Sequence, residues 1–148
     1  MKNFTLLIVF TGIIMISCSG NIPARDVPSI VLNTFKTKFP KAADVEWKNS
    51  EALYTAEFEI GNIDHAVQLN SKGNIVIYKK EIGKSELPGG IKALLSNKFK
   101  TYFTDEIEAV QREGLAYYQI ELESNGKPEK KLVLSADGRE NHSITYWD

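Results

Sequence analysis

The stretch VPSIVLNTFKTKFP, residues 27–40, returns with the same pattern as LPGGIKALLSNKFK at residues 87–100, an offset of 60 positions. Apolar side chains recur at a spacing of four in both copies, which places them on one face of a helix. They are Val31, Phe35 and Phe39 in the first copy and Ile91, Leu95 and Phe99 in the second. The sequence therefore predicts two related amphipathic helices.

The two predicted helices differ at their ends. Pro28 and Pro88 suit a first helical turn, where the N–H that proline lacks would have no partner. Pro40 disfavours helix at the residue before it and is expected to close the first helix. The second copy has no such proline, so we expect its helix to continue into residues 101–103.

The segments that follow each helix alternate between apolar and polar residues, which is the period of a strand with one buried face. The segment YTAEFEI at residues 54–60 matches YQIELE at 118–123, an offset of 64. The next segments, HAVQLNSKG at 65–73 and KKLVLSADG at 130–138, match at an offset of 65. Each of these ends in a glycine that can take the positive φ of a tight hairpin turn.

This matched order of helix, strands and turn predicts an internal duplication. Each unit is expected to contain a helix, a short strand and a meander of three strands, with the last strands at residues 74–80 and 140–147. Short connections require antiparallel pairing. The predicted fold class is α+β: a tandem repeat of helix plus antiparallel β-meander that forms one roughly eight-stranded antiparallel sheet, with two helices packed on one face. Repeat 1 covers residues 27–82 and repeat 2 residues 83–148, in one continuous domain.

Residues 1–17 have the features of a signal peptide, because Lys2 precedes an uncharged apolar run that is too short for a membrane span. The run ends at MISC, and Cys18 is the only cysteine of the chain. MISC resembles a bacterial lipobox, which implies cleavage before Cys18 and lipidation of this residue. Residues 18–26 would then be a lipidated tether. We expect a periplasm-facing protein of the bacterial cell envelope, anchored in the outer rather than the inner membrane because serine, not aspartate, follows Cys18.

Charge and composition exclude some classes of partner. The chain has 18 Lys and Arg against 19 Asp and Glu, a net charge of −1. Proteins that bind nucleic acid carry a strongly basic surface instead. We therefore expect no nucleic-acid partner, and contact with the membrane through the lipid anchor only.

A known family shares these features. The lipobox, the helices that open with VP or LP, the strands Y-x-A-E-F (54–58) and Y-x-I-E-L (118–122), and the turns in K-G or D-G resemble the PepSY-like family of Bacteroidetes periplasmic proteins. The likeness covers residues 27–148. It implies a fold like that of the beta-lactamase inhibitor protein and a non-enzymatic module that binds, or inhibits, an envelope protein or peptide. Inhibition of a β-lactamase does not follow from the fold itself.

The sequence contains no recognisable catalytic motif. His65 and His142 are the only histidines, and neither belongs to an H-E-x-x-H zinc motif. A G-x-S-x-G nucleophile elbow and a phosphate-binding glycine loop are also absent from the sequence. We therefore predict that the protein is not an enzyme and has no catalytic residue.

Polar residues of the predicted strands form a candidate binding surface. They alternate with core residues, so they should lie on the open, solvated sheet face away from the helices. The candidate binding residues are Glu57, Glu59, Tyr117, Gln119, Glu121 and Glu123. A polar face with a rigid aromatic anchor is typical of a protein-binding surface. For any one of these residues, an ordinary solvated position is the alternative interpretation.

A calcium- or small-ligand-responsive periplasmic sensor is the alternative function. Calcium takes several carboxylate and carbonyl oxygens as ligands, and the candidate ligands are Asp105, Glu106, Glu108 and Asp137. The turn around Asp137 lacks the EF-hand series of acids, and its counterpart in repeat 1 holds Lys72, which would repel a cation. We expect no cofactor other than calcium.

Overall fold

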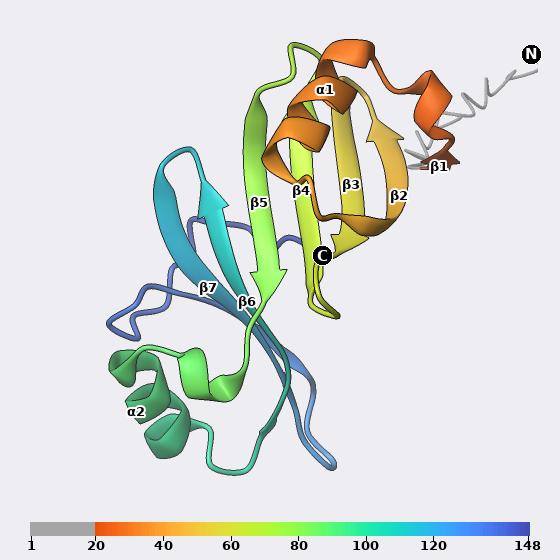
Figure 1. Cartoon of the computed structure of the whole chain (residues 1–148). Helices are drawn as coiled ribbons and strands as arrows, with labels where there is room; N and C mark the ends of the chain where they lie inside the picture. The colour runs from red at the N-terminus through yellow and green to blue at the C-terminus, as the bar shows by residue number, and fades with distance from the viewer. Residues whose placement is uncertain (1–19) are drawn as a thin grey trace, which may run out of the picture.

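The computed structural model describes residues 20–148 (Figure 1). The predicted signal peptide, residues 1–17, and the predicted lipidation site Cys18 lie outside the described residues. The described chain forms one eight-stranded sheet in which the strands neighbour one another in chain order, each pair antiparallel. The predicted α+β class and single antiparallel sheet are confirmed.

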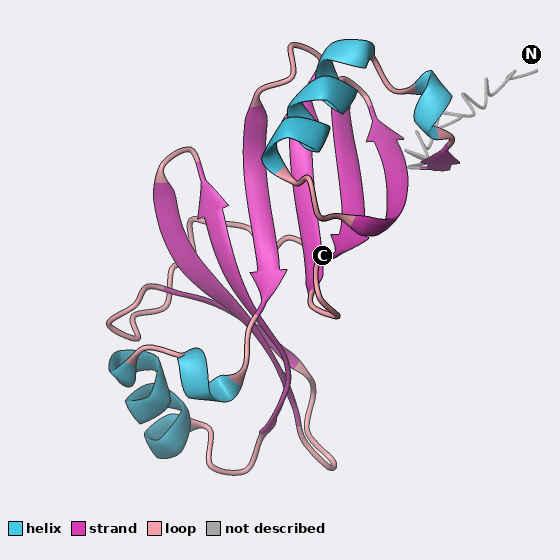
Figure 2. Cartoon of the chain, viewed as in Figure 1, coloured by secondary structure: helices cyan, strands magenta, loops and turns pink. Residues whose placement is uncertain are grey.

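The order of elements is nearly the same in both halves. The first half contains β1 (Gly20–Ile22), a 3₁₀ helix (Ala24–Asp26), α1 (Ser29–Lys38), β2 (Ala43–Ser50), β3 (Leu53–Glu59), β4 (Asp64–Asn70) and β5 (Ile75–Glu81). The second half contains a 3₁₀ helix (Lys84–Glu86), α2 (Gly89–Lys98), β6 (Phe103–Arg112), β7 (Leu115–Glu123) and β8 (Lys130–Leu134). In Figure 2 the two longer helices lie against different parts of the sheet. Within residues 20–148 no helix combines the length and the apolar character needed to cross a bilayer.

Both helices cover the same face of the sheet. Val67 pairs with Tyr78 between β4 and β5, and Lys80 pairs with Ala109 between β5 and β6. Paired residues point to the same side of a sheet, and Tyr78 and Lys80 share a side because they lie two residues apart on β5. The face that carries Val67 therefore continues to Ala109 in the second half. We call the helix-covered side face A and the opposite side face B.

The core on face A consists of two clusters, one under each helix. The cluster under α1 is aromatic: the Phe35 ring lies edge-on to those of Trp47 and Phe58, with centroids 5.1 and 5.0 Å away. The cluster under α2 is aliphatic and consists of Ile82, Leu87, Ile91, Leu95, Ile107, Ile120, Leu122, Leu132 and Leu134. The burial of Val31 and Ile91 confirms the helix faces predicted from the spacing of four.

Helix α2 ends at Lys98, so the prediction that it continues into residues 101–103 is wrong. Phe99 has left the helical region with ψ of 33°, and the Tyr102 N–H donates to the Phe99 carbonyl at 3.0 Å. The two rings meet edge to face at 5.9 Å and pack against the aliphatic cluster. Aromatic burial thus ends α2 at the position where Pro40 follows α1.

The predicted hairpin glycines have positive φ, +79° at Gly73 and +84° at Gly138. Gly138 also touches the first turn of α2, since a Cβ on Gly138 would lie 2.5 Å from the Gly90 carbonyl oxygen. A Cβ on Gly90 would in turn overlap the Asp137 backbone. Gly90 weakens helix propensity, and its lack of a side chain allows the hairpin to pack directly on the helix.

The eighth strand is not the predicted one. Residues 140–147 leave the sheet after a single isolated bridge between Leu134 and Glu140. The Asn141 Oδ1 accepts hydrogen bonds from the Ser143 N–H at 3.0 Å and the Ser143 hydroxyl at 2.7 Å, a local turn that competes with strand pairing. The chain then passes behind β5 in Figure 1, across face B. The remaining strand is β1, which pairs with β2 and is formed by residues that the sequence predicted as part of a tether.

Candidate functional site

Face B has an open region and a covered region. Over β2, β3 and β4 and the adjoining parts of β5 and β6 it is hollowed and lined by acids. Over β5 to β8 it is covered by Ile144, Tyr146 and Trp147, which pack on buried apolar side chains. We call the hollow the acidic groove and the covering residues, Ile144–Asp148, the strap.

The acidic groove has a volume of about 360 Å³ and is lined by carboxylates from five strands. They are Asp44 and Glu46 from β2, Glu57 and Glu59 from β3, Asp64 from β4, Glu81 from β5, and Glu106 and Glu108 from β6. Two of them are neutralised: Glu57 lies 2.6 Å from Lys48, and Glu108 lies 2.8 Å from Lys79. The other six have no ion pair within residues 20–148, so the groove is strongly negative although the whole chain has a net charge of −1.

His65 adds no positive charge to the groove at neutral pH. Its ring stacks between Phe58 and Tyr78, with centroids 5.3 and 5.9 Å away, and its Nδ1 lies 2.8 Å from the Tyr78 hydroxyl. Burial and then the charge of Lys80 lower the pKa of His65 below its ordinary value. Since Phe58 and Tyr78 both belong to the core on face A, the neutral His65 ring lies on that side of the sheet, away from the carboxylates of the groove.

A β-bulge in each repeat places an aspartate beside the acidic strand pair. The pairing register shifts around Asp44 in β2 and around Asp105 in β6. Asp44 has φ of +49°, a left-handed conformation that aspartate tolerates better than most residues. Bulges re-aim side chains in this way. The result is a duplicated acidic arrangement on face B, which joins the acidic groove in repeat 1 and forms a compact group in repeat 2.

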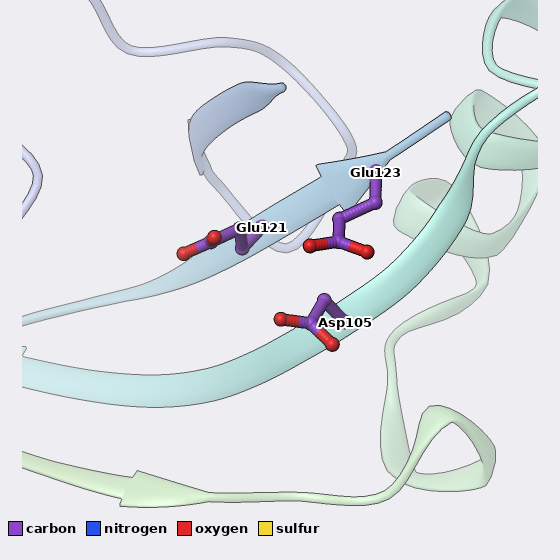
Figure 3. A group of neighbouring side chains, drawn as sticks. All are labelled: Asp105, Glu121 and Glu123. Carbon is purple, nitrogen blue, oxygen red and sulfur yellow. The ribbon is translucent and has the colours of Figure 1, made fainter. Parts of the chain in front are cut away.

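The compact group consists of Asp105, Glu121 and Glu123, whose carboxylate oxygens lie within 4.8 Å of one another. Figure 3 shows the three side chains converging from β6 and β7. Lys131 lies 3.6 Å from Glu121 and offsets part of the charge. Burial raises the pKa of Glu121, and Lys131 opposes this shift. Of the four predicted calcium ligands only Asp105 belongs to this group, and calcium binding stays a prediction.

The other predicted calcium ligands lie elsewhere. Glu106 lines the acidic groove, and Glu108 is buried in its ion pair with Lys79. Asp137 accepts hydrogen bonds from Ser135 and from Arg139, whose Nε lies 2.6 Å from its carboxylate. These contacts lower the pKa of Asp137, with the Ser135 hydrogen bond as the largest cause. Its carboxylate therefore stabilises the hairpin turn.

Two predicted binding residues are buried where the sequence predicted exposure. Tyr117 is 4% exposed and Gln119 is 0% exposed, because the strap covers them. The side chains do project from face B, as their alternation predicts. The Gln119 Nε2 donates to the Trp147 carbonyl at 2.9 Å, and its Oε1 accepts from the Trp147 N–H at 3.0 Å. A side-chain amide here makes the two hydrogen bonds that a neighbouring strand would make.

A buried charge pair links the strap to the acidic groove. The Lys79 Nζ lies 2.8 Å from Glu108 and donates to the Trp147 carbonyl at 3.0 Å. Gln119 donates to the second Glu108 oxygen at 3.1 Å. Burial raises the pKa of Glu108, and the hydrogen bond and charge of Lys79 oppose this shift. Since Lys79 and Glu108 also line the groove, the two regions of face B share a wall.

Sequence reasoning missed several residues of the groove: Asp44, Glu46, Asp64, Lys79 and Glu81. Lys79 and Glu81 lie two residues apart and alternate with Tyr78, Lys80 and Ile82 of face A, so the strand period could have placed them on face B. Asp64 pairs with Glu59 across the β3–β4 hairpin, which the hairpin register could have indicated. Asp44 carried no such signal, because its direction depends on the bulge.

Solved structures from Bacteroides share this fold. A DUF2874 family protein from Bacteroides uniformis is 18% identical, with a TM-score of 0.70 over 76% of this chain and 85% of that chain. A protein from Bacteroides eggerthii, described as a candidate periplasmic protein, is 20% identical, with a TM-score of 0.69 over 77% of this chain and 85% of that chain. A BLIP-like protein from Bacteroides fragilis is 18% identical, with a TM-score of 0.66 over 86% of this chain and 95% of that chain.

No protein-family model matches the sequence, and no curated protein matches it. The structural likenesses, at 18 to 20% identity, establish the fold. BLIP-like describes proteins that resemble the beta-lactamase inhibitor protein, and this is the fold that the family resemblance implied. The chain is an α+β protein of this BLIP-like fold.

Proposed function

We propose that this protein is a periplasm-facing lipoprotein of the PepSY-like family that binds a basic segment of an envelope protein or peptide in its acidic groove. The observation that carries the proposal is the convergence of six carboxylates without an ion pair, within the described residues, on one hollow of about 360 Å³. Such a surface attracts a cationic partner and accelerates its association. Among the predicted binding residues, Glu57 and Glu59 belong to this groove.

The chemistry of the groove favours binding over catalysis. Its lining contains no serine, threonine or cysteine, and His65 is engaged by Tyr78. A nucleophile–base pair of the kind that hydrolases use therefore has no place in this groove. The protein would act by occlusion, covering a basic surface of its partner, and the BLIP-like name of the Bacteroides fragilis neighbour agrees with such a role.

The capture of partners from an envelope extract tests this proposal. We would compare the wild type with Glu59→Lys/Glu81→Lys, which reverses two groove charges, and with Glu51→Lys/Glu113→Lys, which makes the same charge change in two exposed turns. The wild type and the turn variant should capture equal amounts of the same partner, and the groove variant should capture at least tenfold less of it. Added salt should reduce the amount captured. Equal capture by all three proteins would contradict the acidic groove as the binding site.

The lipid anchor has its own test. Only Ser19 separates Cys18 from β1, so lipid on Cys18 would hold this edge of the sheet close to the membrane surface. The description of the Bacteroides eggerthii neighbour agrees with a periplasmic location, and we favour the outer membrane. Cys18→Ala should move the protein from the membrane fraction to the soluble periplasmic fraction. Retention in the membrane fraction would refute lipidation.

A calcium-responsive sensor is the second candidate function, favoured by the convergence of Asp105, Glu121 and Glu123. Calorimetric titration of the protein with calcium, from micromolar to millimolar levels, tests it. Binding should give heat that Asp105→Asn/Glu123→Gln removes. The absence of heat over that range in the wild type would exclude this function.

A further inference from the structure

The strap is bound to face B as a separate peptide would be. Three hydrogen bonds hold its backbone at Trp147. The Gln119 amide donates one to the Trp147 carbonyl at 2.9 Å and accepts one from the Trp147 N–H at 3.0 Å, and the Lys79 ammonium donates one to the same carbonyl at 3.0 Å. Gln119 is fully buried, and its side chain makes one further hydrogen bond, to Glu108. Extended peptides are recognised on sheets by main-chain hydrogen bonds of this kind.

The strap side chains meet cations. The Lys79 Nζ lies 5.1 Å from the Trp147 ring centroid, and the Lys131 Nζ lies 5.1 Å from the Tyr146 ring centroid. Lys131 also forms an ion pair with the Asp148 carboxylate. Both distances are within the range of a cation–π interaction. Lys79 and Lys131 thus contact two adjacent aromatic side chains and the acidic residue that follows them.

The surface under the strap is apolar. Ile77, Val110, Tyr117 and Val133 form its floor, and Ile144 of the strap packs on it beside the two rings. A buried apolar floor with a few placed polar groups is the usual composition of a ligand-binding site. Each polar group here, Gln119, Lys79 and Lys131, faces a defined part of the bound segment.

The strap fits this surface incompletely. The hydroxyls of Tyr117 and Tyr146 are buried, and neither meets a hydrogen-bond partner within the described chain. Burial raises the pKa of Tyr117, and the nearby Arg112 guanidinium opposes this shift. The strap also forms no strand of the sheet, so its release would break no strand pair. A segment that placed a polar group beside the Tyr117 hydroxyl would compete with the strap for the same floor.

We propose that the covered region of face B is a second, peptide-binding site that the strap occupies in cis. The ligand in trans is an extended segment of a partner protein in which two aromatic residues precede an acidic one. Its backbone takes the Gln119 and Lys79 hydrogen bonds, its rings lie against Lys79 and Lys131, and its carboxylate pairs with Lys131. This site differs in place and in ligand charge from the acidic groove, and it goes beyond the function proposed above.

Binding of a synthetic peptide to the full chain tests the proposal. The probe is fluorescently labelled SITYWD, the sequence of residues 143–148, with blocked ends. Trp147→Ala weakens the strap, so this variant should bind the probe at least tenfold more tightly than the wild type. Lys131→Glu in the same background should reverse the gain tenfold or more. A probe with alanine at both aromatic positions should not bind.

Thermal unfolding checks that each variant is folded, and Tyr146→Ala replaces Trp147→Ala if the latter is unfolded. Failure of the probe to bind any strap variant, or equal binding with and without Lys131→Glu, would overturn the proposal. A concentration-dependent dimer that exchanges straps would also overturn it, since the ligand would then be a second copy. Glu59→Lys/Glu81→Lys should leave probe binding unchanged. Failure of the acidic-groove proposal can therefore be distinguished from failure of the strap-site proposal.

Discussion

The two repeats share a helix and a meander but differ in their last segment. In repeat 1 this segment is β5, which stays in the sheet between β4 and β6. In repeat 2 the corresponding residues, 140–148, leave the sheet and cover face B. Face B is consequently open and acidic over most of repeat 1. Over repeat 2 it is covered by the strap, beside which Asp105 and Glu123 stay exposed. Alternation along a strand sets the direction of a side chain, and the final segment of the repeat decides whether it meets solvent.

The cores of the two repeats provide the largest expected effect. Phe35→Ala removes the central ring of the aromatic cluster and should lower the free energy of unfolding by about 3–5 kcal/mol. Leu95→Ala, at the matching position of α2, should cost about 2–5 kcal/mol. Because both helices pack on one sheet, we expect urea unfolding of either variant, followed by circular dichroism, to remain a single transition. Two separated transitions would show that the repeats unfold as independent units.

The contact between helix and hairpin is closer in repeat 2 than in repeat 1. A Cβ on Gly138 would lie 2.5 Å from the Gly90 oxygen, whereas a Cβ on Gly73 would lie 3.0 Å from the Thr34 hydroxyl oxygen. Gly90→Ala should therefore destabilise the protein by up to about 3 kcal/mol through overpacking. Gly89→Ala meets no atom within 4 Å and should be neutral or stabilising by up to about 1 kcal/mol. Equal urea midpoints for the two variants would contradict this close packing.

Substitutions of Gln119 and of Thr55, its counterpart in repeat 1, test how much the strap contributes to stability. Gln119→Leu removes both hydrogen bonds to Trp147 and should cost about 1–2 kcal/mol. The Trp147 ring should become more exposed, which tryptophan fluorescence would report as a red shift. Thr55 accepts one half-exposed hydrogen bond from Gln68, so Thr55→Val should change stability by less than about 1 kcal/mol. Fluorescence unchanged by Gln119→Leu would mean that the amide does not hold the strap.

The smallest expected effect is a change in the pH dependence of stability when Glu108 is replaced. Burial raises its pKa above the ordinary value of 4.5 in the folded state, so the folded protein holds a proton that the unfolded chain has lost. Glu108 therefore adds stability as the pH falls from its raised pKa towards 4.5, and loses this contribution as the pH rises again. Glu108→Gln should flatten this part of the stability profile measured by urea unfolding. An unchanged slope would show that Glu108 is not the group responsible.

The period of the sequence was sufficient to predict most of the fold. The spacing of four identified Val31 and Ile91 as buried helix positions, and the turn glycines Gly73 and Gly138 have the expected positive φ. The end of α2 was predicted wrongly because the burial of Phe99 and Tyr102 stops the helix without a proline. Such tertiary packing leaves no mark in a local pattern.

The candidate site was predictable in part, for a related reason. Glu57 and Glu59 were identified from alternation and do line the groove. Tyr117 and Gln119 have the predicted direction, but the strap buries them. The sequence predicts a strand at residues 140–147, because this segment contains strand-forming aromatic and β-branched residues. Asp44 and Asp105 depend on bulges. Long-range coverage and local register shifts therefore account for what the sequence did not predict.

The contrast between the open and the closed half of face B is tested most directly by carboxyl–lysine cross-linking of the protein to its captured partner. A zero-length reagent joins a carboxylate to a lysine that touches it, and mass spectrometry locates the link. We predict that partner lysines are joined to Glu59, Asp64 and Glu81, in the acidic groove. Links concentrated on Glu51 and Glu113 in the turns, or on Glu123 in repeat 2, would contradict the acidic groove as the binding surface.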